Sequence, residues 1–180
     1  MELLGTHKVT FEEIRSLAIQ CHALDISAYH LFVDSTHEDK SEKTKSTYHD
    51  LITRQLLGLA IALRTKFYQG LDHEGTIPYV AACGLMYKHK KDVEENVAFS
   101  MKDVCDKIIH ADSVSRYMEK GVEKPTTALR GKGNRDKSEW ELSMSVSLFA
   151  EGVLNWVQDI EENTADESEA QAEGSIPARG

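Results

Sequence analysis

The chain has 180 residues, of which 41% are hydrophobic and 28% charged, and this length and composition suit one globular domain with its own core. The formal net charge is -9, and six of the acidic residues lie among the last 20 positions beside a single base, Arg179. The rest of the chain is only mildly acidic, which excludes a general basic field for nucleic acid, so RNA binding would need a local patch.

Two long helices are predicted first. Thr10 followed by Glu13 has the form of a capping box, and apolar residues then recur at three- and four-residue steps as far as residue 34. Residues 41–69 predict a second helix whose apolar surface is wider than one stripe, so we expect it to be central, with neighbours on two sides. The short polar connection favours an antiparallel pair.

The middle of the chain is less regular. Pro78 disfavours a helix before it, and residues 79–87 fit either a strand or a short buried helix. Ser100 with Asp103 marks the start of a third helix over residues 100–111, with an apolar face that would be buried.

A β-hairpin is predicted over residues 121–145, because a glycine-rich basic centre is followed by Trp140, Leu142 and Met144 at every second position. A last helix follows over residues 147–162. The sequence thus predicts a mainly α fold, a four-helix bundle-like domain with a small β-hairpin before the last helix. We expect a single helical domain over residues 1–162 and a disordered acidic tail over residues 163–180.

The cysteine pattern and the apolar runs bear on the compartment. Three cysteines without disulfide or zinc spacing favour a reducing environment. The first residues lack the basic start and apolar run of a signal peptide, and no apolar stretch approaches the roughly 20 residues that span a membrane. We therefore expect a cytoplasmic protein with no membrane partner, no metal site and no cofactor.

One polar stripe on the third helix could carry chemistry. Lys102, Asp106 and His110 lie four residues apart, and residues at that spacing share a helix face. A histidine held by a carboxylate can act as a general acid or base. The other interpretations are a surface ion pair, or a core histidine that is hydrogen bonded at a helix end.

The segment Cys105-Asp106-Lys107-Ile108-Ile109-His110 resembles the motif helix of HEPN-type domains, helical bundles of bacterial and phage-related defence and toxin–antitoxin systems. The pattern there is an Arg, a polar residue and then a His, and the active members are mostly metal-independent endoribonucleases that act as dimers. Asp106 and His110 match the polar residue and the His, but Cys105 takes the place of the Arg. A thiol lacks the cationic fork that holds a phosphate.

A second candidate is the basic loop of the hairpin. Four bases lie within eight residues, together with two glycines, and could bind the phosphates of RNA: Arg130, Lys132, Arg135 and Lys137. The alternative is a solvated hairpin turn.

Three functions follow from these features. The first is a non-catalytic HEPN-like binding module, with a homodimer formed through the side of the third helix and an RNA or protein partner. The second is a metal-independent endoribonuclease that uses His110 and Asp106, with Lys102 or a base of the loop in place of the Arg. The third is a protein-binding inhibitor or accessory subunit.

Overall fold

The computed structural model describes residues 8–33, 40–69, 84–89, 100–117, 126–133 and 139–173. For residues 84–89, 117 and 164–173 it describes the backbone alone. Within these ranges the chain forms four helices and four strands: α1 (Phe11–Phe32), α2 (Glu42–Tyr68), β1 (Gly84–His89), α4 (Met101–Ile109), β2 (Ser113–Tyr117), β3 (Thr126–Lys132), β4 (Glu139–Met144) and α5 (Val146–Glu173). The protein is mainly helical, as the sequence predicts.

The predicted helix starts are confirmed by the caps. The Thr10 side chain accepts a hydrogen bond from the backbone N–H of Glu13, and Ser41 does the same for Thr44. Ser100 and Asp103 form a full capping box at the start of α4. Each cap satisfies a backbone donor that the first helical turn leaves without a partner. Gly70, the residue after the C-cap of α2, lies outside the described residues.

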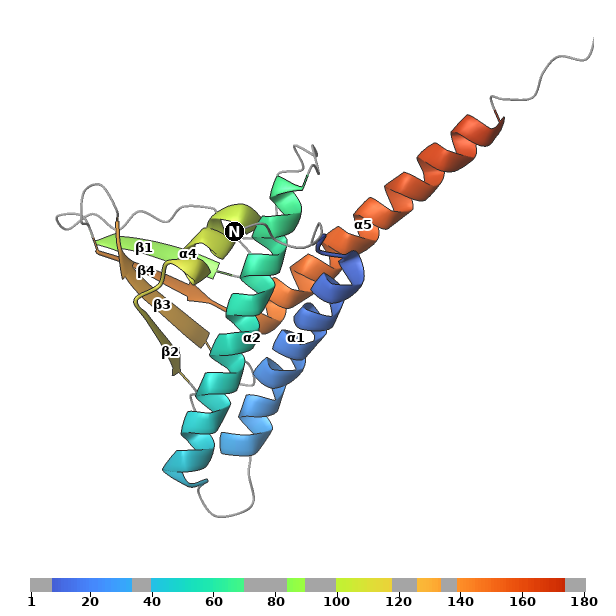
Figure 1. Cartoon of the computed structure of the whole chain (residues 1–180). Helices are drawn as coiled ribbons and strands as arrows, with labels where there is room; N and C mark the ends of the chain where they lie inside the picture. Colours follow the sequence, from blue (N-terminus) through green and yellow to red (C-terminus); the bar gives the residue numbers. More distant parts are fainter. Residues whose placement is uncertain are drawn as a thin grey trace, which may run out of the picture.

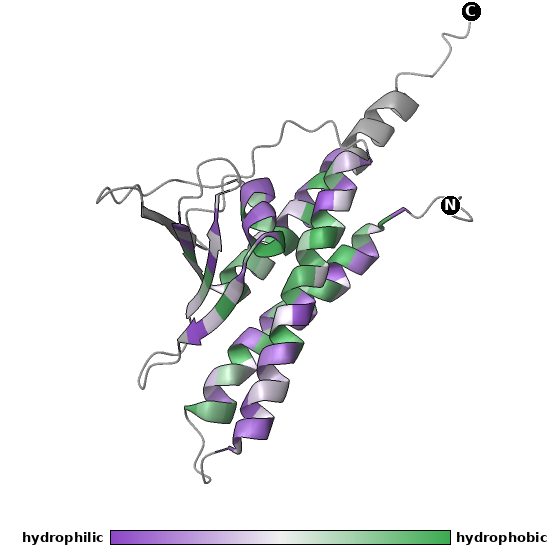
Figure 2. Cartoon of the chain, turned by 60° about the vertical axis from the view of Figure 1, so that its left-hand side comes forward, coloured by the Kyte–Doolittle hydropathy of each residue, from purple (hydrophilic) through white to green (hydrophobic). Residues whose placement is uncertain are grey.

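The three long helices lie on one side of the molecule and the sheet on the other (Figure 1). α1 packs against both α2 and α5, α2 also contacts α4, and α4 contacts β3. Hydrophobic and hydrophilic residues alternate along the helices, with hydrophobic stretches where the helices run side by side (Figure 2). One continuous hydrophobic cluster therefore joins α1, α2, α4, α5 and the inner face of the sheet.

The sheet is antiparallel, with strand order β1-β4-β3-β2. The predicted hairpin is confirmed as β3 and β4, in which Leu129 pairs with Leu142 and Gly131 with Trp140. On β4, Trp140, Leu142 and Met144 are buried and the residues between them are not. The period-two pattern thus selects the face that the helices cover.

A buried ion pair ties the sheet to the helices. Asp25 of α1 and Arg116 of β2 have fully buried side chains, with 2.5 Å between Oδ1 and Nη2. The other oxygen of Asp25 accepts a hydrogen bond of 2.8 Å from the backbone N–H of Ser147, in the first turn of α5, and Arg116 also donates to Thr127 of β3. Four elements converge on this pair, which we call the buried node.

Two predictions need correction. The boundary of the last helix near residue 162 is wrong, because α5 continues to Glu173. The segment 164–173 is rich in Ala, Glu and Gln, which favour a helix and extend one that is already packed. Residues 174–180 lie outside the described residues. The sheet is also larger than the predicted hairpin. It includes β1, which agrees with the strand interpretation for part of residues 79–87, and β2, which the sequence does not predict.

Candidate functional site

The short helix α4 carries the predicted stripe at its outer face. Met101, Val104, Cys105 and Ile108 are buried, which turns Lys102, Asp106 and His110 outward. Lys102 and His110 are exposed, and the Asp106 side chain keeps 37% of its surface. The backbone N–H of His110 donates to the carbonyl of Asp106 and closes the last turn. The structure therefore confirms that the three residues share one side of the helix.

A hollow of about 540 Å³ lies at the C-terminal end of α4. Its lining brings Asp106 and His110 together with Lys107 and with Lys132 of β3, whereas Lys102 does not line it. The two candidate groups from the sequence, the α4 stripe and the hairpin cations, thus meet in space at His110 and Lys132. Asp112 adds a second carboxylate to the same hollow.

The backbone around Gly131 fixes this meeting. A Cβ at Gly131 would lie 2.4 Å from Cζ2 of Trp140 and 3.1 Å from the carbonyl oxygen of His110. The N–H of Asp112 donates to the carbonyl of Arg130 at 2.8 Å, and the Lys107 ammonium lies 4.4 Å from the centroid of the Trp140 ring. Only glycine permits so close an approach, so the end of α4 is seated directly on the hairpin.

Asp106 is engaged by an arginine that the sequence analysis does not single out. Nε of Arg64, on α2, lies 2.8 Å from Oδ1 of Asp106. Nη2 of the same guanidinium donates to the Tyr68 hydroxyl at 2.6 Å, and the guanidinium lies 4.7 Å from the centroid of the Tyr68 ring. Between Asp106 and His110 the structure shows the backbone hydrogen bond of the last helical turn, and among the described residues no side-chain hydrogen bond joins the carboxylate to the imidazole. The carboxylate is thus paired with Arg64, not with the histidine.

Cys105 is fully buried in the core cluster. A residue at this position points away from the hollow, so position 105 cannot present a cation to a ligand there. The cation nearest to Asp106 comes instead from α2, through Arg64.

The hairpin bases are partly neutralised across the strands. Nε of Arg130 lies 2.6 Å from Oε2 of Glu141, and Nζ of Lys132 lies 4.0 Å from Oε1 of Glu139. Arg130 and Lys132 also line a neighbouring hollow of about 320 Å³. Arg135 and Lys137, the other predicted RNA contacts, lie outside the described residues. The described part of the loop therefore presents paired charges instead of a basic patch.

The outer face of α2 carries exposed apolar residues. The wide apolar surface that the sequence predicts for this helix indicates them only in part. α1 and α4 cover it on two sides, yet Leu57, Ile61 and Tyr68 remain 38%, 49% and 75% exposed. With Arg54 and Arg64 they follow alternating steps of three and four residues, the spacing of a coiled-coil seam. We call these five residues, with Asp50 one step earlier, the α2 seam.

No helix among the described residues is long and apolar enough to cross a membrane. No group of three or more His, Cys, Asp or Glu side chains in the same ranges is placed to hold a metal ion.

Comparison of the chain with protein-family models, with curated proteins and with solved structures gives no match. The candidate site is therefore interpreted from its own geometry.

Proposed function

We propose that this chain is a non-catalytic, HEPN-like interaction module that binds protein through the outer side of α2 and α4, with a second copy of itself as the partner. The observation that carries the proposal is the α2 seam. Leu57 and Ile61 lie side by side on the outward face, and each exposes more than a third of its surface. Exposed aliphatic residues at coiled-coil spacing are typical of a helix that packs against another helix.

The seam is complementary to itself. In an antiparallel pairing centred between Leu57 and Ile61, Leu57 of one copy meets Ile61 of the other. Asp50 then faces Tyr68 of the second copy. The Tyr68 oxygen accepts a hydrogen bond from Arg64 within its own chain, so its O–H remains to donate to that carboxylate. Arg54 faces the Arg64–Asp106 pair, whose carboxylate is still 37% exposed.

The charges of the hollow support a binding role over a catalytic one. Asp106 is held by Arg64, and the hairpin bases Arg130 and Lys132 face glutamates. A nuclease needs cations that stay available to the scissile phosphate as charge develops on it. Arg64 and Arg130 are already engaged by carboxylates, at 2.8 and 2.6 Å, so neither guanidinium is available to a substrate.

The test is the oligomeric state of the purified protein, measured by sedimentation velocity over a range of concentrations. We expect a monomer–dimer equilibrium that Leu57→Asp and Ile61→Asp shift to monomer, because each places a carboxylate in the centre of the seam. Ile19→Asp is the matched control, since Ile19 is also an exposed isoleucine, 53% accessible, on α1. A wild-type protein that stays monomeric at high micromolar concentration would refute the homodimer.

One observation favours a second function, a metal-independent endoribonuclease. The hollow at the end of α4 brings His110, Lys107 and Lys132 together around a space of about 540 Å³, and a solvent-exposed histidine near two amines could move a proton during phosphodiester cleavage. RNA cleavage in EDTA by the wild type and by His110→Ala separates the two functions. Cleavage that disappears in the variant would establish the nuclease, and its absence from both proteins fits the interaction module.

A further inference from the structure

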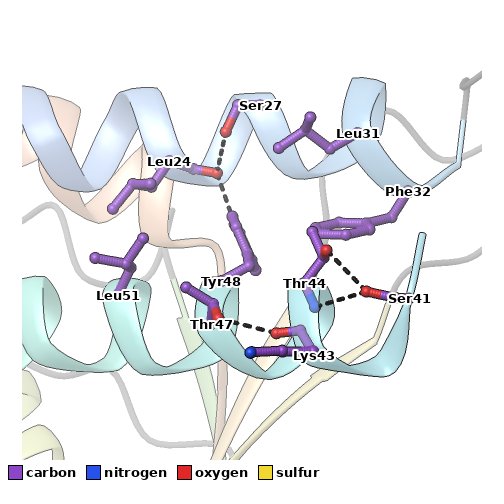
Figure 3. A pocket seen from close by; sticks show the side chains of 10 residues that line it. All are labelled: Leu24, Ser27, Leu31, Phe32, Ser41, Lys43, Thr44, Thr47, Tyr48 and Leu51. Atoms are coloured by element: carbon purple, nitrogen blue, oxygen red, sulfur yellow. Dashed lines mark hydrogen bonds between the residues drawn. The ribbon is translucent and has the colours of Figure 1, made fainter.

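A groove separate from the α4 site lies between α1 and α2, near the end of the pair where α1 finishes and α2 begins (Figure 3). Its volume is about 460 Å³, within the range of roughly 300–1,000 Å³ that small-molecule sites occupy. Leu24, Leu31 and Phe32 contribute from α1, and Tyr48 and Leu51 from α2. Leu31 and Leu51 are each 42% exposed, so both walls carry aliphatic side chains that a ligand would bury.

The floor of the groove is aromatic. The Phe32 and Tyr48 rings meet edge to face, with 5.1 Å between centroids. Tyr48 is only 5% exposed, and its hydroxyl donates to the carbonyl of Leu24 at 2.6 Å. Burial raises the pKa of the Tyr48 hydroxyl to about 12, which keeps it neutral at physiological pH.

The other hydroxyls of the groove are hydrogen bonded within the helix pair. Ser27 donates to the carbonyl of Leu24, and Thr47 donates to the carbonyl of Lys43. Ser41 accepts the N–H of Thr44 as the cap of α2 and shares a hydrogen bond with the Thr44 hydroxyl. These groups are already satisfied, so the interior of the groove favours an apolar chain over a polar ligand.

The rim carries a positive charge. Among the described residues that line the groove, Lys43 is the one charged residue. Lys43 lies in the first turn of α2, where the helix dipole adds to a positive potential. The groove therefore combines an apolar interior with a cationic rim.

We propose that this groove binds a small aliphatic carboxylate, with its hydrocarbon chain between Leu31 and Leu51 and its carboxylate at Lys43. The apolar walls provide the affinity. Lys43 favours a carboxylate over an ammonium head group. On α2 the groove is lined by residues between Ser41 and Leu51, and its lining does not include Leu57 or Ile61 of the α2 seam.

The experiment is a calorimetric titration of the full chain with octanoate and with octylammonium, which share one chain and differ in head group. We expect octanoate to bind more tightly, by about two- to fivefold, the effect of one solvent-exposed ion pair. Lys43→Gln should remove this difference. Leu51→Asp should weaken octanoate at least about tenfold, because it places a like charge and a polar group on the wall.

Two matched variants serve as controls for the effects of Lys43→Gln and Leu51→Asp. Lys45→Gln removes a lysine two positions away that pairs with Glu42 and does not line the groove, so it should leave both affinities unchanged. Ile19→Asp adds a carboxylate at an exposed aliphatic position outside the groove and should also be silent. Equal binding of the two probes, an unchanged octanoate affinity in Leu51→Asp, or no octanoate binding at millimolar concentration would overturn the proposal. Circular dichroism confirms that each variant is folded.

Discussion

Two arginine–carboxylate pairs in this protein differ in what surrounds them. Asp25 and Arg116 of the buried node have side chains with no exposed surface, whereas Arg64 and Asp106 keep 16% and 37%. The first pair joins a helix to an edge strand and also holds the first turn of α5. The second lies where α2 meets α4, beside the α2 seam. The same chemistry thus organises the fold in one place and sets the charge of a surface in the other.

The largest effect is expected at the buried node. Asp25→Ala leaves the Arg116 guanidinium buried without its counter-charge and removes the acceptor of the Ser147 N–H. Loss of one partner from a buried pair costs about 3–5 kcal/mol, a large part of the stability of a small domain. Urea unfolding followed by circular dichroism should show this loss, or a chain that does not fold.

A double replacement tests whether the loss in Asp25→Ala comes from the unpaired charge of Arg116. In Asp25→Leu with Arg116→Met both charges are absent, so no unpaired charge stays in the core. We expect the double variant to recover part of the stability that Asp25→Ala loses. A double variant less stable than the single one would show that the node contributes net stability beyond charge compensation.

An intermediate effect is expected at Gly131, where the end of α4 meets the hairpin. Gly131→Ala places a Cβ 2.4 Å from the Trp140 ring, and such overpacking costs about 1–3 kcal/mol. Gly58→Ala is the matched control, because its Cβ would meet Leu17 at an ordinary 3.6 Å and alanine favours the interior of a helix. We expect opposite signs for the two variants in thermal unfolding, and two equal losses would contradict the close packing of α4 on the hairpin.

The smallest effect is expected at the pair of Arg64 and Asp106. Asp106→Ala removes a partner that is 37% exposed, and pairs of this kind contribute about 0–1 kcal/mol. Arg64 keeps its contact with the Tyr68 hydroxyl. Urea unfolding should therefore place this variant close to the wild type. A loss as large as that of Asp25→Ala would erase the distinction between the two pairs.

Local signals predict the helical part of this fold well. The caps at Thr10 and Ser100, the helix start near residue 41 and the alternation on β4 depend on neighbours in the sequence and are confirmed. β2 is different, because an inward-facing arginine, Arg116, breaks the apolar alternation of a half-buried strand. Its partner Asp25 is 91 residues away, and no local pattern can show that this charge is compensated.

In the candidate site, too, local features are predictable from the sequence and contacts between distant elements are not. The shared face of Asp106 and His110 follows from helical spacing alone. The contact with Arg64 depends on how α4 lies against α2, and the meeting of His110 with Lys132 depends on the close approach at Gly131. The wide apolar surface of α2 was a usable signal for the seam, since α1 and α4 together cannot cover all sides of one helix.

The hydrogen bond from the Ser147 backbone to Asp25 spans 122 residues, and it makes one amide a reporter of the whole domain. Ser147 is buried, so we expect its amide proton to exchange with solvent when α1 and α5 separate and not through fraying of the far end of α5. Its exchange rate in native buffer should then report the free energy of that opening, without denaturant and at a single position.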